Sequence, residues 1–178
     1  MGTESAYRGR LKASGGDSRA ILLPGHQGSW EGLMNDATAL PPNIQEFNEI
    51  VAVIFAKLYI SHPVEKTLDP TEIATAIGVV STLPSGLPFN EVFESTIRWL
   101  RREGYINAHG NDPRERATLT GRAFQAMNAV PPVLKTLQDA VPSLPQSANT
   151  GTLLVAATSS GHTKQTGSII RYIFGWKE

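Results

Sequence analysis

The sequence of 178 residues contains no cysteine. This absence excludes disulfide bonds, thiol catalysis and cysteine-based zinc sites, and it fits a reducing compartment. An excess of charge of either sign is also missing, because 16 Lys and Arg residues balance 16 Asp and Glu residues. The net charge of the whole chain therefore gives no indication of a polyanionic partner.

Long hydrophobic runs are absent as well. The longest apolar run covers residues 50–56 and is followed by Lys57, so it is too short to span a bilayer. The basic residues near the N-terminus are not followed by an apolar run, so we expect no secretory signal. These absences predict a cytoplasmic protein that does not associate with membranes.

Motifs of catalysis or metal binding are missing too. No Gly-rich nucleotide loop follows a predicted strand, and no GxSxG motif occurs. Glu91 and Glu94 share a helical face, where a catalytic carboxylate pair is the alternative to an ordinary solvated surface. No histidine has the spacing of a metal ligand; the four are His26, His62, His109 and His162. The sequence therefore predicts no enzyme, no metal and no cofactor.

Residues 1–42 differ in composition from the rest of the chain. They are rich in Gly, Ser and Ala, carry only scattered apolar residues, and end in Pro41-Pro42. Four basic residues balance four acidic ones, whereas an arm that binds nucleic acid is normally basic. We expect a polar arm that is a loop or partly disordered.

Residues 43–130 read as a domain with the order helix, helix, helix, strand, strand, helix. Asn43 followed by Glu46 resembles a capping box, and apolar residues then recur at helical spacing up to Pro63. Asp69-Pro70-Thr71-Glu72 marks the start of a second, short helix. The remaining expected elements are a loop at 79–88, a helix at 88–104, strands at 105–108 and 116–119, and a helix at 121–128 capped by Thr120.

Two segments of this domain, residues 94–106 and 116–127, resemble a known superfamily. ESTIRWLRREGYI followed by RATLTGRAFQAM is similar to the recognition helix and wing of winged helix-turn-helix proteins, such as the MarR-like and PadR-like regulators. Leu100 and Gly104 match the residues that close the third helix of that superfamily, and Leu119-Thr120 match the pair that ends the wing. The resemblance covers about half the chain. It implies a mainly α fold with a small antiparallel β wing, a winged helix-turn-helix with extra C-terminal helices.

The resemblance implies a DNA-binding transcriptional regulator that acts as a homodimer on double-stranded DNA. In that geometry Ser95 and Arg98 reach base edges, and the arginines of the wing lie near phosphates. The candidate DNA-binding residues are Ser95, Arg98, Arg101, Arg102, Arg114 and Arg116.

The charge balance of this domain weakens the prediction that it binds DNA. Residues 43–130 carry eight basic and ten acidic residues, and residues 89–122 carry six basic and five acidic residues. Phosphate neutralisation supplies most non-specific affinity, so this is a small electrostatic footprint. The alternative is a winged-helix module that binds a protein partner without DNA, which the acidic Glu91 and Glu94 also favour.

Residues 131–178 form a C-terminal extension with apolar segments. We expect a short helix at 133–141, a small apolar segment at 151–159 and an amphipathic helix at 167–174. Apolar faces of this size have to be covered. Either packing on the chain's own domain or dimerisation satisfies that requirement.

Overall fold

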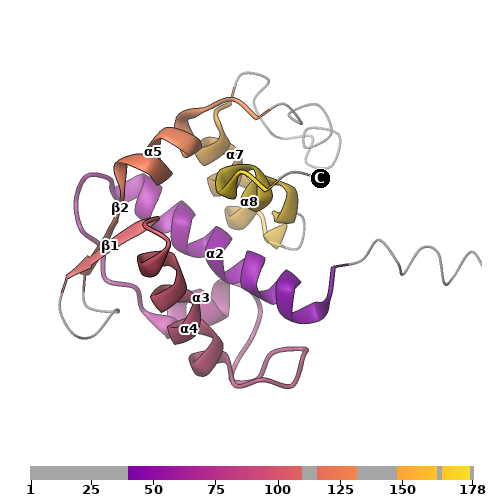
Figure 1. Ribbon diagram of the computed structural model, residues 1–178. Coiled ribbons are helices and arrows are strands. Elements are labelled where there is room, and N and C mark those ends of the chain that lie inside the picture. Colours follow the sequence, from indigo (N-terminus) through magenta and orange to yellow (C-terminus); the bar gives the residue numbers. More distant parts are fainter. Residues whose placement is uncertain (1–39, 110–115, 132–147, 164–165, 177–178) are drawn as a thin grey trace, which may run out of the picture. The chain divides into compact units, whose positions relative to one another are not determined.

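The fold was obtained as a computed structural model, which describes residues 40–109, 116–131, 148–163 and 166–176 (Figure 1). Within these ranges the chain is mainly helical, with six helices and a two-stranded antiparallel sheet, as predicted. The expected arm up to residue 39, the turn that carries Arg114, and the helix expected at 133–141 lie outside the described residues.

Helix α2 (Pro42–Ser61) is the centre of the fold. Residues 50–56 are all buried, because α2 contacts α3, α4, β2, α7 and α8 around its circumference (Figure 1). The expected capping box at its start is wrong. Pro41 occupies the N-cap position without a side-chain bond, and Pro42 begins the helix with the backbone angle that a first turn needs. The carboxylate of Glu46 instead bonds Ser85.

Helices α3 (Pro70–Ala76) and α4 (Phe89–Arg102) follow the local signals of the sequence closely. Asp69 caps α3, since its carboxylate accepts a hydrogen bond from the Thr71 N–H at 2.7 Å. Helix α4 is amphipathic, and its inner face buries Phe93, Ile97 and Leu100. The chain leaves α4 through Gly104, whose φ of +72° suits glycine.

Strands β1 (Ile106–His109) and β2 (Arg116–Leu119) pair antiparallel, with Ile106 opposite Leu119 and His109 opposite Arg116. A single residue between α2 and α3 extends this sheet. Lys66 exchanges backbone hydrogen bonds of 2.8 and 3.0 Å with Ala117. Three separate segments of the chain therefore meet at this sheet.

Helix α5 (Gly121–Asn128) begins at the predicted cap, because the Thr120 hydroxyl accepts a hydrogen bond from the Ala123 N–H. The C-terminal helices α7 (Thr150–Ser159) and α8 (Gly167–Phe174) return to α2. Leu153, Leu154 and Ile170 have no exposed surface in the single chain. The apolar faces of α7 and α8 thus pack within their own chain, whereas a homodimer stays a prediction.

Gly151 allows the close approach of α7 to α2. A Cβ atom at this position would lie 2.5 Å from Cζ of Tyr59. The Tyr59 hydroxyl donates a hydrogen bond to Asn128 at 3.0 Å and accepts one from Asn149 at 2.8 Å. These bonds fix the ring at the junction of α2, α5 and α7.

Candidate functional site

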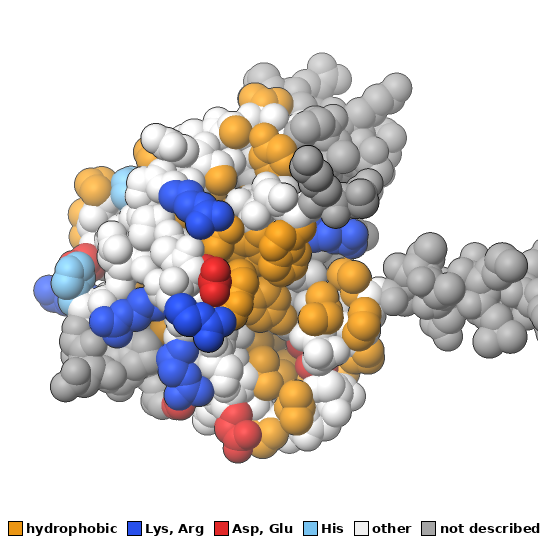
Figure 2. All heavy atoms as spheres, in the orientation of Figure 1, with side chains coloured by type: hydrophobic (Ala, Val, Ile, Leu, Met, Phe, Trp, Pro, Cys, Tyr) orange, Lys and Arg blue, Asp and Glu red, His pale blue; other side chains and the backbone are white. Residues whose placement is uncertain are grey.

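The second half of α4 carries three exposed arginines: Arg98, Arg101 and Arg102. Burial of the opposite face of this amphipathic helix directs them toward solvent. Arg98 donates a hydrogen bond to the Ser95 hydroxyl at 3.1 Å, and Arg102 pairs with Glu103 at 3.2 Å. Figure 2 shows basic side chains gathered beside an apolar part of the surface. The predicted outward orientation of the α4 arginines is confirmed.

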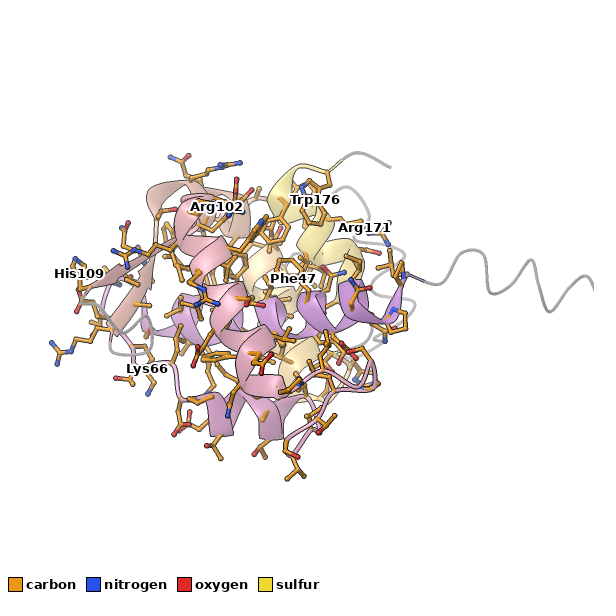
Figure 3. The ribbon with its side chains drawn as sticks, turned by 60° about the horizontal axis from the view of Figure 1, so that its bottom comes forward. Phe47, Lys66, Arg102, His109, Arg171 and Trp176 are labelled. Atoms are coloured by element: carbon orange, nitrogen blue, oxygen red, sulfur yellow. The ribbon has the colours of Figure 1, made fainter. Side chains whose placement is uncertain are left out.

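The sheet adds two more exposed basic residues, Lys66 and Arg116. Arg116 begins β2, and Lys66 is bridged to the next residue of that strand, Ala117. His109 ends β1, and its Nδ1 lies 2.8 Å from a carboxylate oxygen of Glu65 (Figure 3). Lys66 was not among the predicted site residues, since only the folded chain places it beside β2.

Arg122 differs from these basic residues, because its guanidinium contacts other residues of the fold. Its guanidinium lies 4.6 Å from the centroid of the Tyr105 ring and donates hydrogen bonds to the Tyr105 hydroxyl and to the Glu103 carbonyl. A cation held over an aromatic face in this way contributes to stability. Arg122 therefore joins α5 to the C-terminal end of α4.

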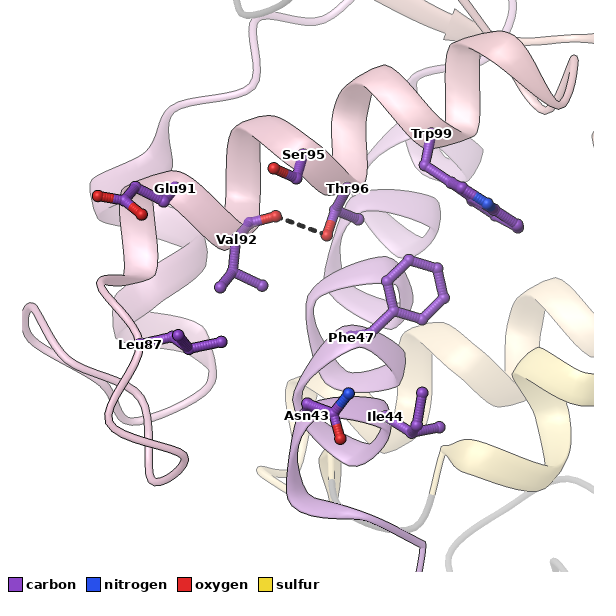
Figure 4. Close-up of a pocket in the computed structure, with 9 residues that line it drawn as sticks. All are labelled: Asn43, Ile44, Phe47, Leu87, Glu91, Val92, Ser95, Thr96 and Trp99. Atoms are coloured by element: carbon purple, nitrogen blue, oxygen red, sulfur yellow. Dashed lines mark hydrogen bonds between the residues drawn. The ribbon is translucent and has the colours of Figure 1, made fainter.

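A groove of about 470 Å³ lies between the first turns of α2 and the length of α4 (Figure 4). Its walls are largely apolar because five of the lining side chains are apolar or aromatic. The Thr96 hydroxyl is bonded within α4, since it donates to the Val92 carbonyl. Ser95 lines this groove, although the sequence placed it among the residues that face DNA. The nine lining residues are Asn43, Ile44, Phe47, Leu87, Glu91, Val92, Ser95, Thr96 and Trp99.

Aromatic rings extend the apolar surface from the groove onto α8. The Trp99 ring lies 5.2 Å from Phe47, 5.1 Å from Phe174 and 6.4 Å from Trp176, measured between ring centroids and with the edge of one ring toward the face of the other. Trp176 is 45% exposed, and Leu87 at the opposite end is 47% exposed. We call the groove together with Trp176 the apolar band. Figure 2 shows apolar side chains gathered in the middle of one face of the molecule, with polar side chains among them.

The loop between α3 and α4 contributes Leu87 to the groove, and a buried carboxylate holds this loop in place. Glu46 of α2 accepts two hydrogen bonds of 2.6 Å, from the N–H and from the hydroxyl of Ser85. The loop also closes on itself, since the Phe89 N–H donates to the Ser81 carbonyl. This attachment places Leu87 over the groove.

We expect Glu46→Ala to loosen this loop and to lower the free energy of unfolding by about 1 kcal/mol. The loss stays modest because Ser85 is exposed and water replaces part of the lost bonding. Hydrogen exchange of the amides of residues 81–88 measures the effect. Glu91→Ala, at an exposed position of the groove, is the control and should leave both quantities unchanged. Equal exchange in wild type and Glu46→Ala would contradict the assigned role.

Other kinds of site find little support in the described ranges. There, no cluster of three or more His, Asp or Glu side chains is suitable for holding a metal ion. None of the described helices has the length and apolar character needed to cross a membrane. Glu91 lies at the groove and is exposed, whereas Glu94 is half-buried and makes an interaction of its own, so the two carboxylates have different surroundings.

The chain matches no known protein family, no curated protein and no solved structure. Its function has to be inferred from two neighbouring surfaces of α4. One is the basic surface of α4 and the sheet, defined by Lys66, Arg98, Arg101, Arg102 and Arg116. The other is the apolar band.

Proposed function

We propose that this chain is a winged-helix protein that binds double-stranded DNA and regulates transcription as a homodimer. The observation that carries the proposal is the set of three exposed arginines on the second half of α4, next to a small antiparallel sheet. In this interpretation α4 is the recognition helix, and β1, β2 and their connecting turn are the wing.

The backbone arrangement supports this interpretation. Helix α4 leads through Gly104 directly into β1, and Leu100 N-terminal to it is fully buried. The bridge between Lys66 and Ala117 attaches the sheet to the segment after α2. A sheet that is attached to α4 through Gly104 and to the segment after α2 through Lys66 keeps a fixed position relative to α4. A wing needs this when it contacts the DNA backbone beside the recognition helix.

The charges on the two elements suggest different roles. Arg98 lies in the second half of α4, where a long side chain with a planar guanidinium is suited to base edges in a major groove. Lys66 and Arg116 lie on the sheet, where they are suited to phosphates. The number of such basic residues is small, so we expect a DNA affinity that depends on salt less steeply than that of strongly basic regulators.

Titration of fluorescent duplexes, first a mixed-sequence pool and then sequences selected from it, tests this function. We expect Arg98→Ala to lower the affinity for a selected duplex about 10-fold, because it removes a base contact. Lys66→Ala and Arg116→Ala should each reduce the slope of log affinity against log salt by about one, because each removes a phosphate contact.

The matched control is Lys57→Ala, since Lys57 is a basic residue of α2 whose charge is already paired with Glu72 at 2.6 Å. It should leave both the affinity and the salt slope unchanged. If no duplex binds at low salt, or if Lys57→Ala weakens binding as much as Arg98→Ala, DNA binding through α4 is wrong.

The apolar band favours a second candidate function, a winged-helix module that binds protein without DNA. The two candidates predict different dimers. A DNA-binding dimer places its two α4 helices about 34 Å apart on one face, to match successive major grooves. A solution structure of the dimer in which the α4 helices face opposite directions would favour the interaction module.

A further inference from the structure

The apolar band lies between two edges that carry arginines. On one edge is Arg102 of α4, and on the other is Arg171 of α8 (Figure 3). Arg98 lies on the α4 side, where it bonds the groove residue Ser95. We propose that the band docks an amphipathic helix of a partner protein whose apolar stripe fills the groove and whose flanking positions are acidic. The proposal does not rest on DNA binding.

The band is an unfilled surface in the described part of the chain. Trp176, Leu87 and Ile44 are each more than a third exposed. Leu87 and Ile44 line the groove together with Phe47 and Trp99, and the Trp99 ring contacts those of Phe47 and Trp176. Single exposed apolar residues are ordinary, but a contiguous apolar surface bordered by charge marks a site of interaction. Its two tryptophans and neighbouring arginines match the residue types that dominate binding energy at protein interfaces.

The shape of the groove fits a helix. Val92 and Trp99 of α4 line it and are seven residues apart, which corresponds to two helical turns or about 10 Å. Ile44 and Phe47 of α2, three residues apart, face them from the other wall. A partner helix of two to three turns presents apolar residues at positions i, i+4 and i+7 at this spacing.

The charges at the edges select an acidic helix. Arg98 reaches the groove through its hydrogen bond to Ser95, a lining residue. Arg171 of α8 is half-buried, and its guanidinium has no carboxylate partner among the described residues. Glu103 pairs with Arg102 at one edge, and Glu91 lies at the Leu87 end of the groove. The remaining arginine charge favours acidic flanks on the partner, with a basic residue only at the Leu87 end.

A displayed library of 16-residue helical peptides, randomised at every surface position and selected on the full chain without nucleic acid, tests the inference. We expect the enriched peptides to combine an apolar stripe with net negative charge. Synthetic copies of the enriched peptides should bind Leu87→Glu and Trp176→Ala at least 10-fold more weakly than wild type. Arg171→Gln should weaken their binding about threefold. Because the assay contains no DNA, its result is independent of the duplex titrations.

Val80→Glu is the matched control, because Val80 is 95% exposed and does not line the groove. It should bind the enriched peptides as wild type does. Thermal unfolding checks that each variant is folded, and Ile44→Glu replaces Leu87→Glu if that variant is not.

Three outcomes would overturn the proposal. The first is that basic peptides are enriched. The second is that selection on the wild-type chain enriches peptides no more than selection on the Leu87→Glu variant does. The third is a monomer–dimer equilibrium in sedimentation that Leu87→Glu abolishes and Val80→Glu preserves, since the occupant of the band would then be a second copy of this chain.

Discussion

Phe55→Ala is expected to lower the free energy of unfolding by about 3–5 kcal/mol, the largest effect of any substitution considered for this chain. Phe55 lies in α2 and has no exposed surface. Its ring lies 6.2 Å from that of Tyr105 and 6.0 Å from that of Phe174, between ring centroids. Its removal leaves a cavity where α2, the start of the sheet and α8 meet. Urea denaturation followed by circular dichroism measures the loss.

Phe124→Ala is the control for this substitution, because the same atoms are removed from a half-buried position. The Phe124 ring stacks on His62 at 4.2 Å and lies toward the surface of α5. We expect a loss of about half that of Phe55→Ala, because less apolar surface leaves water when Phe124 folds into place. Equal losses for the two variants would show that Phe55 is not at the centre of the core.

Gly151→Ala is expected to destabilise the chain by about 2 kcal/mol, although alanine normally strengthens a helix. The new methyl group meets the Tyr59 ring at 2.5 Å, and overpacking of this kind costs up to about 3 kcal/mol. The higher helix propensity of alanine than of glycine offsets about 1 kcal/mol of this loss. The ring cannot turn aside without breaking its hydrogen bonds to Asn128 and Asn149. Thermal unfolding of the two proteins gives the difference.

The sign of the effect should change when the clash is removed. In a Tyr59→Ala background, Gly151→Ala is expected to stabilise by about 0.5–1 kcal/mol, because only the propensity term remains. Gly121→Ala is a second control, since no atom lies within 4 Å of the position of its Cβ. If Gly151→Ala stabilises the wild-type background as well, α7 and α2 are not in close contact at Tyr59.

Elements that depend on neighbouring residues could be predicted from the sequence. The caps at Asp69 and Thr120 were predicted because a capping side chain bonds an N–H only two or three residues away. The third helix was expected at 88–104 and occurs at Phe89–Arg102, because its apolar spacing identifies the buried face. The same spacing gave the outward orientation of Arg98, Arg101 and Arg102.

Features that depend on distant residues could not be predicted. Glu46 has the spacing of a capping box with Asn43, yet it bonds Ser85, 39 residues away. Lys66 lies in the connection between α2 and α3, and its backbone pairs with Ala117 of β2, 51 residues later in the chain. The apolar band requires α8 to fold back beside α4, so neither the role of Trp176 nor the position of Ser95 in the groove follows from local pattern. The sequence thus indicated which basic residues face solvent, but not the surface beside them.

The position of α2 at the centre of the fold has a consequence for synthesis. Helix α2 leaves the ribosome well before α7 and α8, which cover it, and the first of these, α7, begins about 90 residues after α2 ends. At translation rates of about 5–20 residues per second, that interval lasts about 5–20 s. During this time the nascent chain carries a helix with apolar residues on every side, while α7 and α8, which bury part of it in the folded chain, are not yet made. Newly made chains are therefore most exposed to aggregation, and to capture by chaperones, before residues 150–174 emerge.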